Sequence, residues 1–174
     1  MKTSLLGFGL LATSLTTIAA EPTPVINDFG YFYNVPAHVS NLSQAQFKIA
    51  FDVGDGAKHG EQNNPINSLA RFINMHVAHG VKPENIQLAL VVHGSASVDM
   101  LENSVYKSRF DVDNKNQSLI TQLLANNTVV YVCGQSAMHM KVAAEQLIPG
   151  VKMALSAMTA HAQLQQQGYT LNPF

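Results

Sequence analysis

The stretch Val129-Val130-Tyr131-Val132-Cys133-Gly134-Gln135-Ser136 joins an apolar run to the only cysteine of the chain, and then to residues that favour a turn and a helix start. An apolar run without polar interruption is typical of a parallel strand that is buried on both faces. Ser136 is a residue type that caps helices. The stretch therefore predicts a strand that ends at Cys133 and a helix capped by Ser136.

The same alternation extends to both sides of this stretch. Apolar residues recur at helical spacing between further apolar runs, and Asn64, Asn116 and Ser156 are the predicted helix caps. The segment 102–116 is polar and is predicted to be a loop. The alternation predicts a single α/β domain with a mostly parallel sheet of about five strands and helices on both faces. Besides the strand that ends at Cys133, the predicted strands are residues 47–53, 86–92, 151–155 and, at an edge, 169–171.

The first 20 residues differ from the rest of the chain. Lys2 is their only charged side chain, Leu5 to Leu11 is a short apolar run, and small residues lead to Ala19-Ala20. This is the three-part pattern of a secretory signal peptide (residues 1–20), and the run is shorter than the ~20 residues that span a bilayer. We therefore expect export to the periplasm and a mature protein free of the membrane. An N-terminal membrane anchor or a disordered tail is the alternative interpretation.

Residues 21–45 are expected to form an irregular N-terminal arm before the domain at residues 46–174. Pro22, Pro24 and Pro36 disfavour a central strand or a long helix. The aromatic side chains of the arm could pack onto the domain or cover a neighbouring subunit; they are Phe29, Tyr31, Phe32 and Tyr33.

Charge is sparse and balanced, with 10 basic and 11 acidic side chains and no run of lysine or arginine. This composition disfavours a nucleic-acid partner. Gly54-Asp55-Gly56 lacks the rest of a phosphate-binding loop, and the Gly-x-Ser-x-Gly motif of serine hydrolases does not occur. We predict no cofactor from the sequence.

Three of the predicted strands end in polar or glycine-rich residues. These ends are Asp52 to Gly56, His93 to Ser97 and Cys133 to Ser136. In an open parallel sheet, ligands bind outside the carboxyl ends of the strands. The three segments should therefore meet at one edge, where the candidates for ligand binding are Asp52, Gly94, Gly134, Gln135 and Ser136.

Cys133 and His93 are the candidate catalytic residues. A cysteine just before a helix N-terminus has a lowered pKa and is nucleophilic, because free amides and the helix dipole favour the thiolate. The alternative is an inert buried residue, since free cysteines are among the most buried residue types. His93 could transfer a proton or orient an anion, or it could be a structural histidine. Asp52 could bind a cation or cap the following helix.

The remaining histidines give weaker signals, and we predict no metal site. His139 lies between Met138 and Met140, which suggests a copper site, but a helix with Met140 toward the core and Met138 outside is the better interpretation. His76 and His79 are three residues apart on one predicted helix and could be a metal pair, but no third ligand is evident, and a solvated helix face is the better interpretation. His38, His59 and His161 are isolated.

The segment from Ile86 to Phe174 resembles the DsrE/DsrF-like proteins, especially their small exported members. The matching pieces are Val91 to Gly94, Val112 to Asn116, Val130 to Ser136, Ile148 to Lys152 and Gln165 to Tyr169, and Phe51-Asp52-Val53 also fits. The resemblance implies a five-stranded α/β domain that assembles into trimers or hexamers. In the sulfur-oxidising and tRNA-thiolating branches a cysteine carries sulfur as a persulfide, and Cys133 is similar to it by its place after the third strand.

The sequence leaves three hypotheses open. In the first, Cys133 is a persulfide carrier in a sulfur relay, assisted by His93, and exchanges sulfur with a donor or acceptor protein. In the second, the chain is a non-catalytic oligomeric module that binds a small anion or a metal at the same edge, with Cys133 as buried packing. In the third, the domain is a structural oligomer without chemistry at this edge.

Overall fold

A computed structural model of the protein describes residues 23–35 and 42–172. The predicted signal peptide, residues 1–20, lies outside these ranges. The described chain contains a five-stranded sheet, and its strands are β1 (Phe47–Val53), β2 (Ile86–Val92), β3 (Thr128–Cys133), β4 (Lys152–Ala154) and β5 (Thr170–Asn172). The strand order is β4-β3-β2-β1-β5, and every neighbouring pair is parallel. The predicted α/β class, the parallel sheet and the edge position of the last strand are confirmed.

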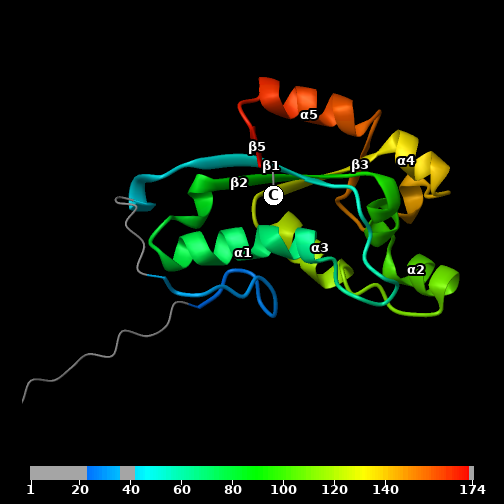
Figure 1. The fold of residues 1–174 in the computed structure, drawn as a ribbon, viewed down its shortest axis with the longest axis horizontal. Helices are drawn as coiled ribbons and strands as arrows, with labels where there is room; N and C mark the ends of the chain where they lie inside the picture. The colour runs from blue at the N-terminus through cyan, green and yellow to red at the C-terminus, as the bar shows by residue number, and fades with distance from the viewer. Residues whose placement is uncertain (1–22, 36–41, 173–174) are drawn as a thin grey trace, which may run out of the picture.

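The order of the strands decides which helix covers which face. The chain first moves across the sheet from β1 to β4, and α1 (Asn64–Ala78) and α3 (Gln117–Ala125) lie on the face below the sheet in Figure 1. It then returns past all four strands to place β5 beside β1. Right-handed crossovers in opposite directions fall on opposite faces. For this reason α5 (Ala157–Gln166), unlike α1 and α3, lies on the other face (Figure 1).

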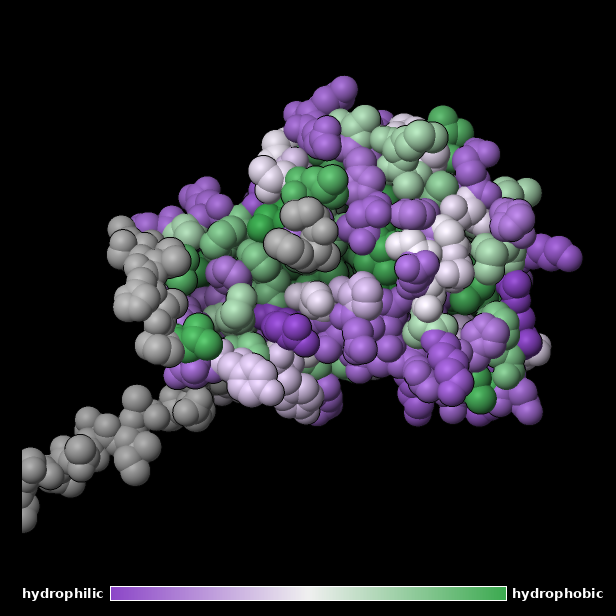
Figure 2. All heavy atoms as spheres, in the orientation of Figure 1, coloured by the Kyte–Doolittle hydropathy of each residue, from purple (hydrophilic) through white to green (hydrophobic). Residues whose placement is uncertain are grey.

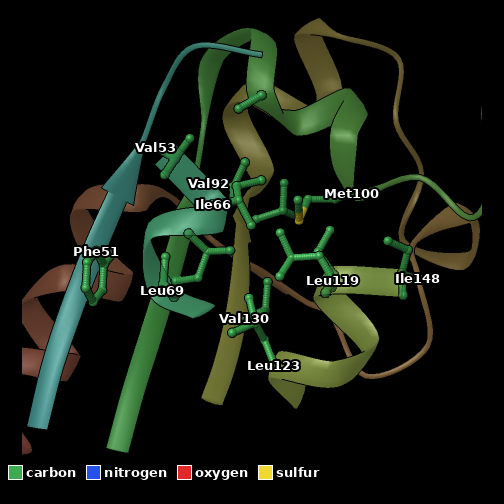
Figure 3. Packing of buried hydrophobic residues seen from close by; sticks show 14 of the residues in the cluster. Phe51, Val53, Ile66, Leu69, Val92, Met100, Leu119, Leu123, Val130 and Ile148 are labelled. Carbon is green, nitrogen blue, oxygen red and sulfur yellow. The ribbon is translucent and has the colours of Figure 1, made fainter. Parts of the chain in front are cut away.

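The larger core lies between the sheet and the helices α1 and α3. Ile66 and Leu69 of α1 and Leu119 of α3 are fully buried there against alternate residues of the strands, such as Val92 and Val130 (Figure 3). The α5 face has a smaller core, which consists of Ala50, Ala89, Val91, Ala160 and Leu164. Small residues on the strands let α5 approach the sheet closely, and the two faces together bury β2 almost completely.

Two predictions for the helices before β3 are wrong. The cap of α1 is Asn63, not Asn64, because the Asn63 side chain accepts a hydrogen bond from the Ile66 amide at 3.3 Å. The predicted loop at residues 102–116 contains a helix, α2 (Asn103–Phe110), which is held by the fully buried Tyr106 rather than by a regular apolar stripe.

The described chain also contains short 3-10 helices, which are η1 (Leu42–Gln44), η2 (Pro83–Asn85), η3 (Gly94–Met100) and η4 (Ala144–Gln146).

The helix after β3 also differs from its prediction. It is α4 (Gly134–His139), so it begins directly at the strand end, and Ser136 lies inside it instead of capping it. It ends early because Lys141 has a left-handed backbone (φ 56°), and a turn leads on to η4. Ser156, in contrast, caps α5 as predicted, with its hydroxyl accepting from the Thr159 amide at 3.0 Å.

The arm at residues 23–35 contains no helix or strand and is tied to α1. Asn74 accepts from the amides of Val25 and Ile26 and donates to the carbonyls of Ile26 and Phe29, with all four distances between 2.9 and 3.0 Å. Ile26 is fully buried in the larger core. The packing predicted for the aromatic residues holds only in part, since Phe29 contacts the core while Tyr31 and Tyr33 are exposed.

The surface is mixed in character. Figure 2 shows hydrophilic side chains gathered over α2 and hydrophobic ones in the band between α5 and α1, where the sheet edge formed by β5 lies. Leu171 of this short edge strand is 49% exposed. Among the described helices, none combines the length and the apolar character needed to cross a membrane.

Candidate functional site

The strand register brings three predicted site residues to the same face and the same end of the sheet. Val92 pairs with Val132, so the residues that follow them, His93 and Cys133, stand beside each other at the carboxyl ends of β2 and β3. Asp52 pairs with Val91 from the other side. Because side chains alternate along a strand, these three share the face of Ala50, Ala89 and Tyr131, the face that α5 covers. The convergence expected from topology therefore occurs beneath α5.

These side chains line a pocket of about 320 Å³. Five of the seven predicted site residues take part, and α5 and the turn before it supply residues that the sequence did not indicate. The lining consists of Asp52, His93, Cys133, Gln135 and Ser136, together with Ser156, Ala157, Met158 and His161.

The two remaining predicted residues, Gly94 and Gly134, do not line the pocket. Each lies where a side chain would collide with backbone. A Cβ atom on Gly94, whose φ is 54°, would stand 2.6 Å from the carbonyl oxygen of Gly54. A Cβ atom on Gly134 would stand 2.7 Å from the carbonyl oxygen of Ala154. Both glycines therefore permit the close backbone packing that holds the strand ends together.

The Cys133 sulfur lies between the beginnings of two helices. Its residue is only 6% exposed, and burial raises the pKa of the thiol. The amide and hydroxyl of Ser136 and the amides of Ala157 and Gln135 hydrogen-bond the sulfur and outweigh burial, so the net pKa is lowered. Gln135 and Ser136 belong to α4 and Ala157 to α5. Four donors from two helix N-termini thus favour the thiolate, the reactive form of cysteine.

Asp52 bridges two histidines that line the pocket with it. Its Oδ2 lies 2.9 Å from Nε2 of His93, and its Oδ1 lies 2.6 Å from Nε2 of His161. Burial raises the pKa of Asp52, but the hydrogen bonds from His93 and His161 outweigh burial. The net pKa is therefore lowered, and the carboxylate is favoured. A carboxylate only accepts hydrogen bonds, so both Nε2 atoms carry a proton. In the neutral form of each ring, Nδ1 is then the basic nitrogen.

His161 is the functional candidate that sequence reasoning missed. It follows Ala160 and lies one turn after Ala157, two residues of the α5 surface that faces the sheet. Its side chain is 17% exposed. Helical spacing alone places His161 beside the apolar stripe. That this stripe covers Asp52 depends on the strand order, which the sequence pattern did not provide.

Two other histidines, one in α1 and one at its C-terminal end, have structural contacts. His76 and His79 each contact a carbonyl oxygen one turn earlier in α1 at 2.7 Å, and His76 stacks on Phe72. As predicted for the helix after β3, Met138 is exposed and Met140 packs against the core. Within residues 23–35 and 42–172, no three His, Cys, Asp or Glu side chains are grouped in a way that could hold a metal ion.

Comparison with known proteins agrees with this architecture. Two solved structures share the fold. One is described as a protein of unknown function, MTH1491, from Methanobacterium thermoautotrophicum (13% identity, 73% of this chain and 98% of that one, TM-score 0.51). The other is the ychN protein from E. coli (21% identity, 72% of this chain and 97% of that one, TM-score 0.50). At these identities the likeness concerns the fold alone.

A search of curated proteins found no match. The sequence profile of the DsrE/DsrF-like family, in contrast, matches residues 48–173, which is most of the chain and includes every residue that lines the pocket. The chain therefore belongs to the DsrE/DsrF-like family.

Proposed function

We propose that this protein is a sulfur carrier in which Cys133 holds a persulfide and passes its outer sulfur to a partner. The observation that carries the proposal is the position of the Cys133 sulfur between the amides of α4 and α5, in a pocket that also contains His93. The thiolate that these donors favour is both a nucleophile toward sulfur and a good leaving group.

The chemistry needs no external oxidant. In uptake, the Cys133 thiolate attacks the outer sulfur of a donor persulfide, R–S–SH, and the donor leaves as the thiolate R–S⁻. In release, an acceptor thiolate attacks the outer sulfur on Cys133, the sulfur–sulfur bond breaks, and Cys133 leaves as a thiolate with the electron pair. The hydrogen bonds that lower the Cys133 pKa stabilise it in both directions.

The test is to load the purified mature protein with inorganic polysulfide and measure its intact mass. The proposal expects a gain of one sulfur atom that a reducing agent removes, and no gain in Cys133→Ser. Slow alkylation of Cys133, with a pKa at or above that of an ordinary thiol, would contradict it. Absence of added sulfur on a well-folded protein would leave the non-catalytic binding module as the better hypothesis.

We further propose that the mature protein acts in the periplasm as a trimer or hexamer and exchanges sulfur with a donor or acceptor protein. The signal-peptide pattern of residues 1–20 supports export. Family membership supports the assembly. Cell fractionation with detection of the processed N-terminus tests the location, and light scattering of the mature protein tests the assembly. Cytoplasmic retention of the full-length chain, or a monomer at micromolar concentration, would overturn the corresponding part.

A further inference from the structure

Asp52 connects His93 to a second histidine on a different layer of the fold. Asp52 lies on β1, His93 follows β2, and His161 lies on α5. Both oxygens of the carboxylate are used, one for each Nε2 atom, at 2.9 Å for His93 and 2.6 Å for His161. The contact to His161 is the shorter of the two. The His161 side chain is also the more buried, with 17% of its surface exposed against 36% for His93.

This arrangement fixes the orientation of the carboxylate. A carboxylate that is bound through one oxygen can turn about its own axis, whereas one bound through both oxygens to separate elements cannot. With Asp52 fixed, Nε2 of His93 is held as a donor, and Nδ1 is the nitrogen that remains for a reacting group. Gly54 lies close against the same ring, since a Cβ atom there would stand 2.7 Å from Cε1 and 3.2 Å from Nε2 of His93.

We propose that His161 and Asp52 are positioning residues that hold His93 as the general base of the sulfur-transfer step. This inference rests on the proposed function. In release, Nδ1 of His93 accepts the proton of the acceptor thiol R–SH. The resulting R–S⁻ attacks the outer sulfur of the Cys133 persulfide, Cys133 leaves as a thiolate, and the product is R–S–SH. One proton moves to His93, and no electron is gained or lost overall.

The same helix serves both reacting groups. Ala157, at the start of α5, donates its amide to the Cys133 sulfur, and His161, one turn later, binds Asp52. The titratable groups that line the pocket with His93 are Asp52, Cys133 and His161. A shift of α5 would therefore alter the leaving group and the base together.

The first experiment compares His161→Leu, which removes the donor, with His161→Gln, whose amide nitrogen can replace Nε2. Sulfur transfer from loaded Cys133 to 2-mercaptoethanol is measured from pH 6 to about pH 10, where the acceptor thiol ionises by itself. A positioned general base contributes ~10²–10⁴-fold, and loss of its positioning should cost about tenfold at neutral pH. His161→Leu should approach the wild-type rate at alkaline pH, and His161→Gln should stay near wild type throughout. Gln165→Leu, an exposed position of α5, is the matched control.

The second readout is independent of sulfur transfer. Nitrogen NMR of the histidine rings should show His93 protonated at Nε2 in the wild type and in His161→Gln, and a mixture of tautomers in His161→Leu. A profile for His161→Leu that runs parallel to wild type at every pH, with an unchanged His93 tautomer, would overturn the inference and leave Cys133 as a carrier. If wild-type Cys133 takes up no sulfur, the proposed function fails, and the NMR result alone decides whether His161 positions His93.

Discussion

The backbone amide of Ala157, at the start of α5, is one of the hydrogen-bond donors that lower the pKa of the Cys133 thiol, although Cys133 ends β3 and leads into a helix on the other face of the sheet. Cys133 ends β3 and leads into α4, which packs Ala137 into the larger core. Ala157 begins α5, after β4, and faces the smaller core. The loops after β3 and β4 thus leave the sheet toward opposite faces. The crevice between two such loops is the topological switch point, where open α/β sheets bind ligands. The chain places its only cysteine at this point.

Ser136→Ala should make Cys133 less reactive. The variant removes the hydroxyl donor, so the pKa of the thiol should rise while the amide donors stay in place. A hydrogen bond to a charged group contributes about 1.5–3 kcal/mol, so alkylation by iodoacetamide at neutral pH should slow roughly tenfold. The pH dependence of alkylation measures the change. Ser108→Ala, at an exposed position of α2, is the control, and an unchanged rate in Ser136→Ala would show that the hydroxyl does not stabilise the thiolate.

Gly54→Ala should displace His93. The new Cβ atom would stand 2.7 Å from Cε1 and 3.2 Å from Nε2 of the imidazole, so the ring has to turn away from Asp52. Sulfur transfer should fall as in His93→Gln, and urea unfolding should show a loss of about 1–3 kcal/mol, the usual cost of overpacking. In a His93→Ala background the added methyl group should cost almost nothing. Equal costs in both backgrounds would mean that Gly54 is required by the backbone and not by His93.

Asp99→Asn should stabilise the protein at neutral pH. Asp99 is fully buried, and its Oδ2 accepts from the Ala57 amide at 3.0 Å and from Asn63 Nδ2 at 2.8 Å, while Oδ1 has no partner among the described residues. Burial raises the pKa of Asp99 above the ordinary value of 3.8, despite these hydrogen bonds. Asparagine can keep both hydrogen bonds through its oxygen without a buried charge. We expect a gain of roughly 1–2 kcal/mol.

The pH dependence of the free energy of unfolding tests whether the charged form of Asp99 destabilises the fold. Because the Asp99 pKa is higher in the folded than in the unfolded state, the folded protein binds more protons between the two values. The contribution of Asp99 to the free energy of unfolding therefore falls as pH rises above about 4 and then levels off. Urea unfolding across this range should show a flatter profile for Asp99→Asn than for wild type. A lower stability of the variant at pH 7 would mean that the charged form is favoured.

Asn74→Ala should release the N-terminal arm. The variant removes four hydrogen bonds to the backbone of residues 25–29 and leaves buried polar groups unpaired. We expect a loss of roughly 3 kcal/mol in urea unfolding and faster proteolysis within residues 23–35. Asn64→Ala, on an exposed part of the same helix, should change little. Resistance of the arm to proteases in Asn74→Ala would mean that burial of Ile26 holds the arm without the asparagine.

Some features of the site could be predicted from local sequence and others could not. Apolar runs in β1, β2 and β3 are long enough to locate the strands, and their polar ends identify Asp52, His93 and Cys133 as candidates. Gly94 and Gly134 have the composition of a ligand loop, but the structure uses them for close backbone contacts. The pattern around α2 failed because a helix that is held by one buried tyrosine has almost no amphipathic signal.

The type and approximate position of most helices and strands follow from the sequence, since periodicity and turn residues are local properties of the chain. The same patterns predict that strands alternate with helices, that the sheet is parallel, and that the cysteine stands where a strand meets a helix. The return of β5 to the β1 edge, in contrast, is known only from the three-dimensional arrangement of the strands. That return puts α5 over the face where Asp52, His93 and Cys133 lie, and so brings the amide of Ala157 to the sulfur and His161 to Asp52. Strand order is a long-range choice made by packing, and no local pattern encodes it.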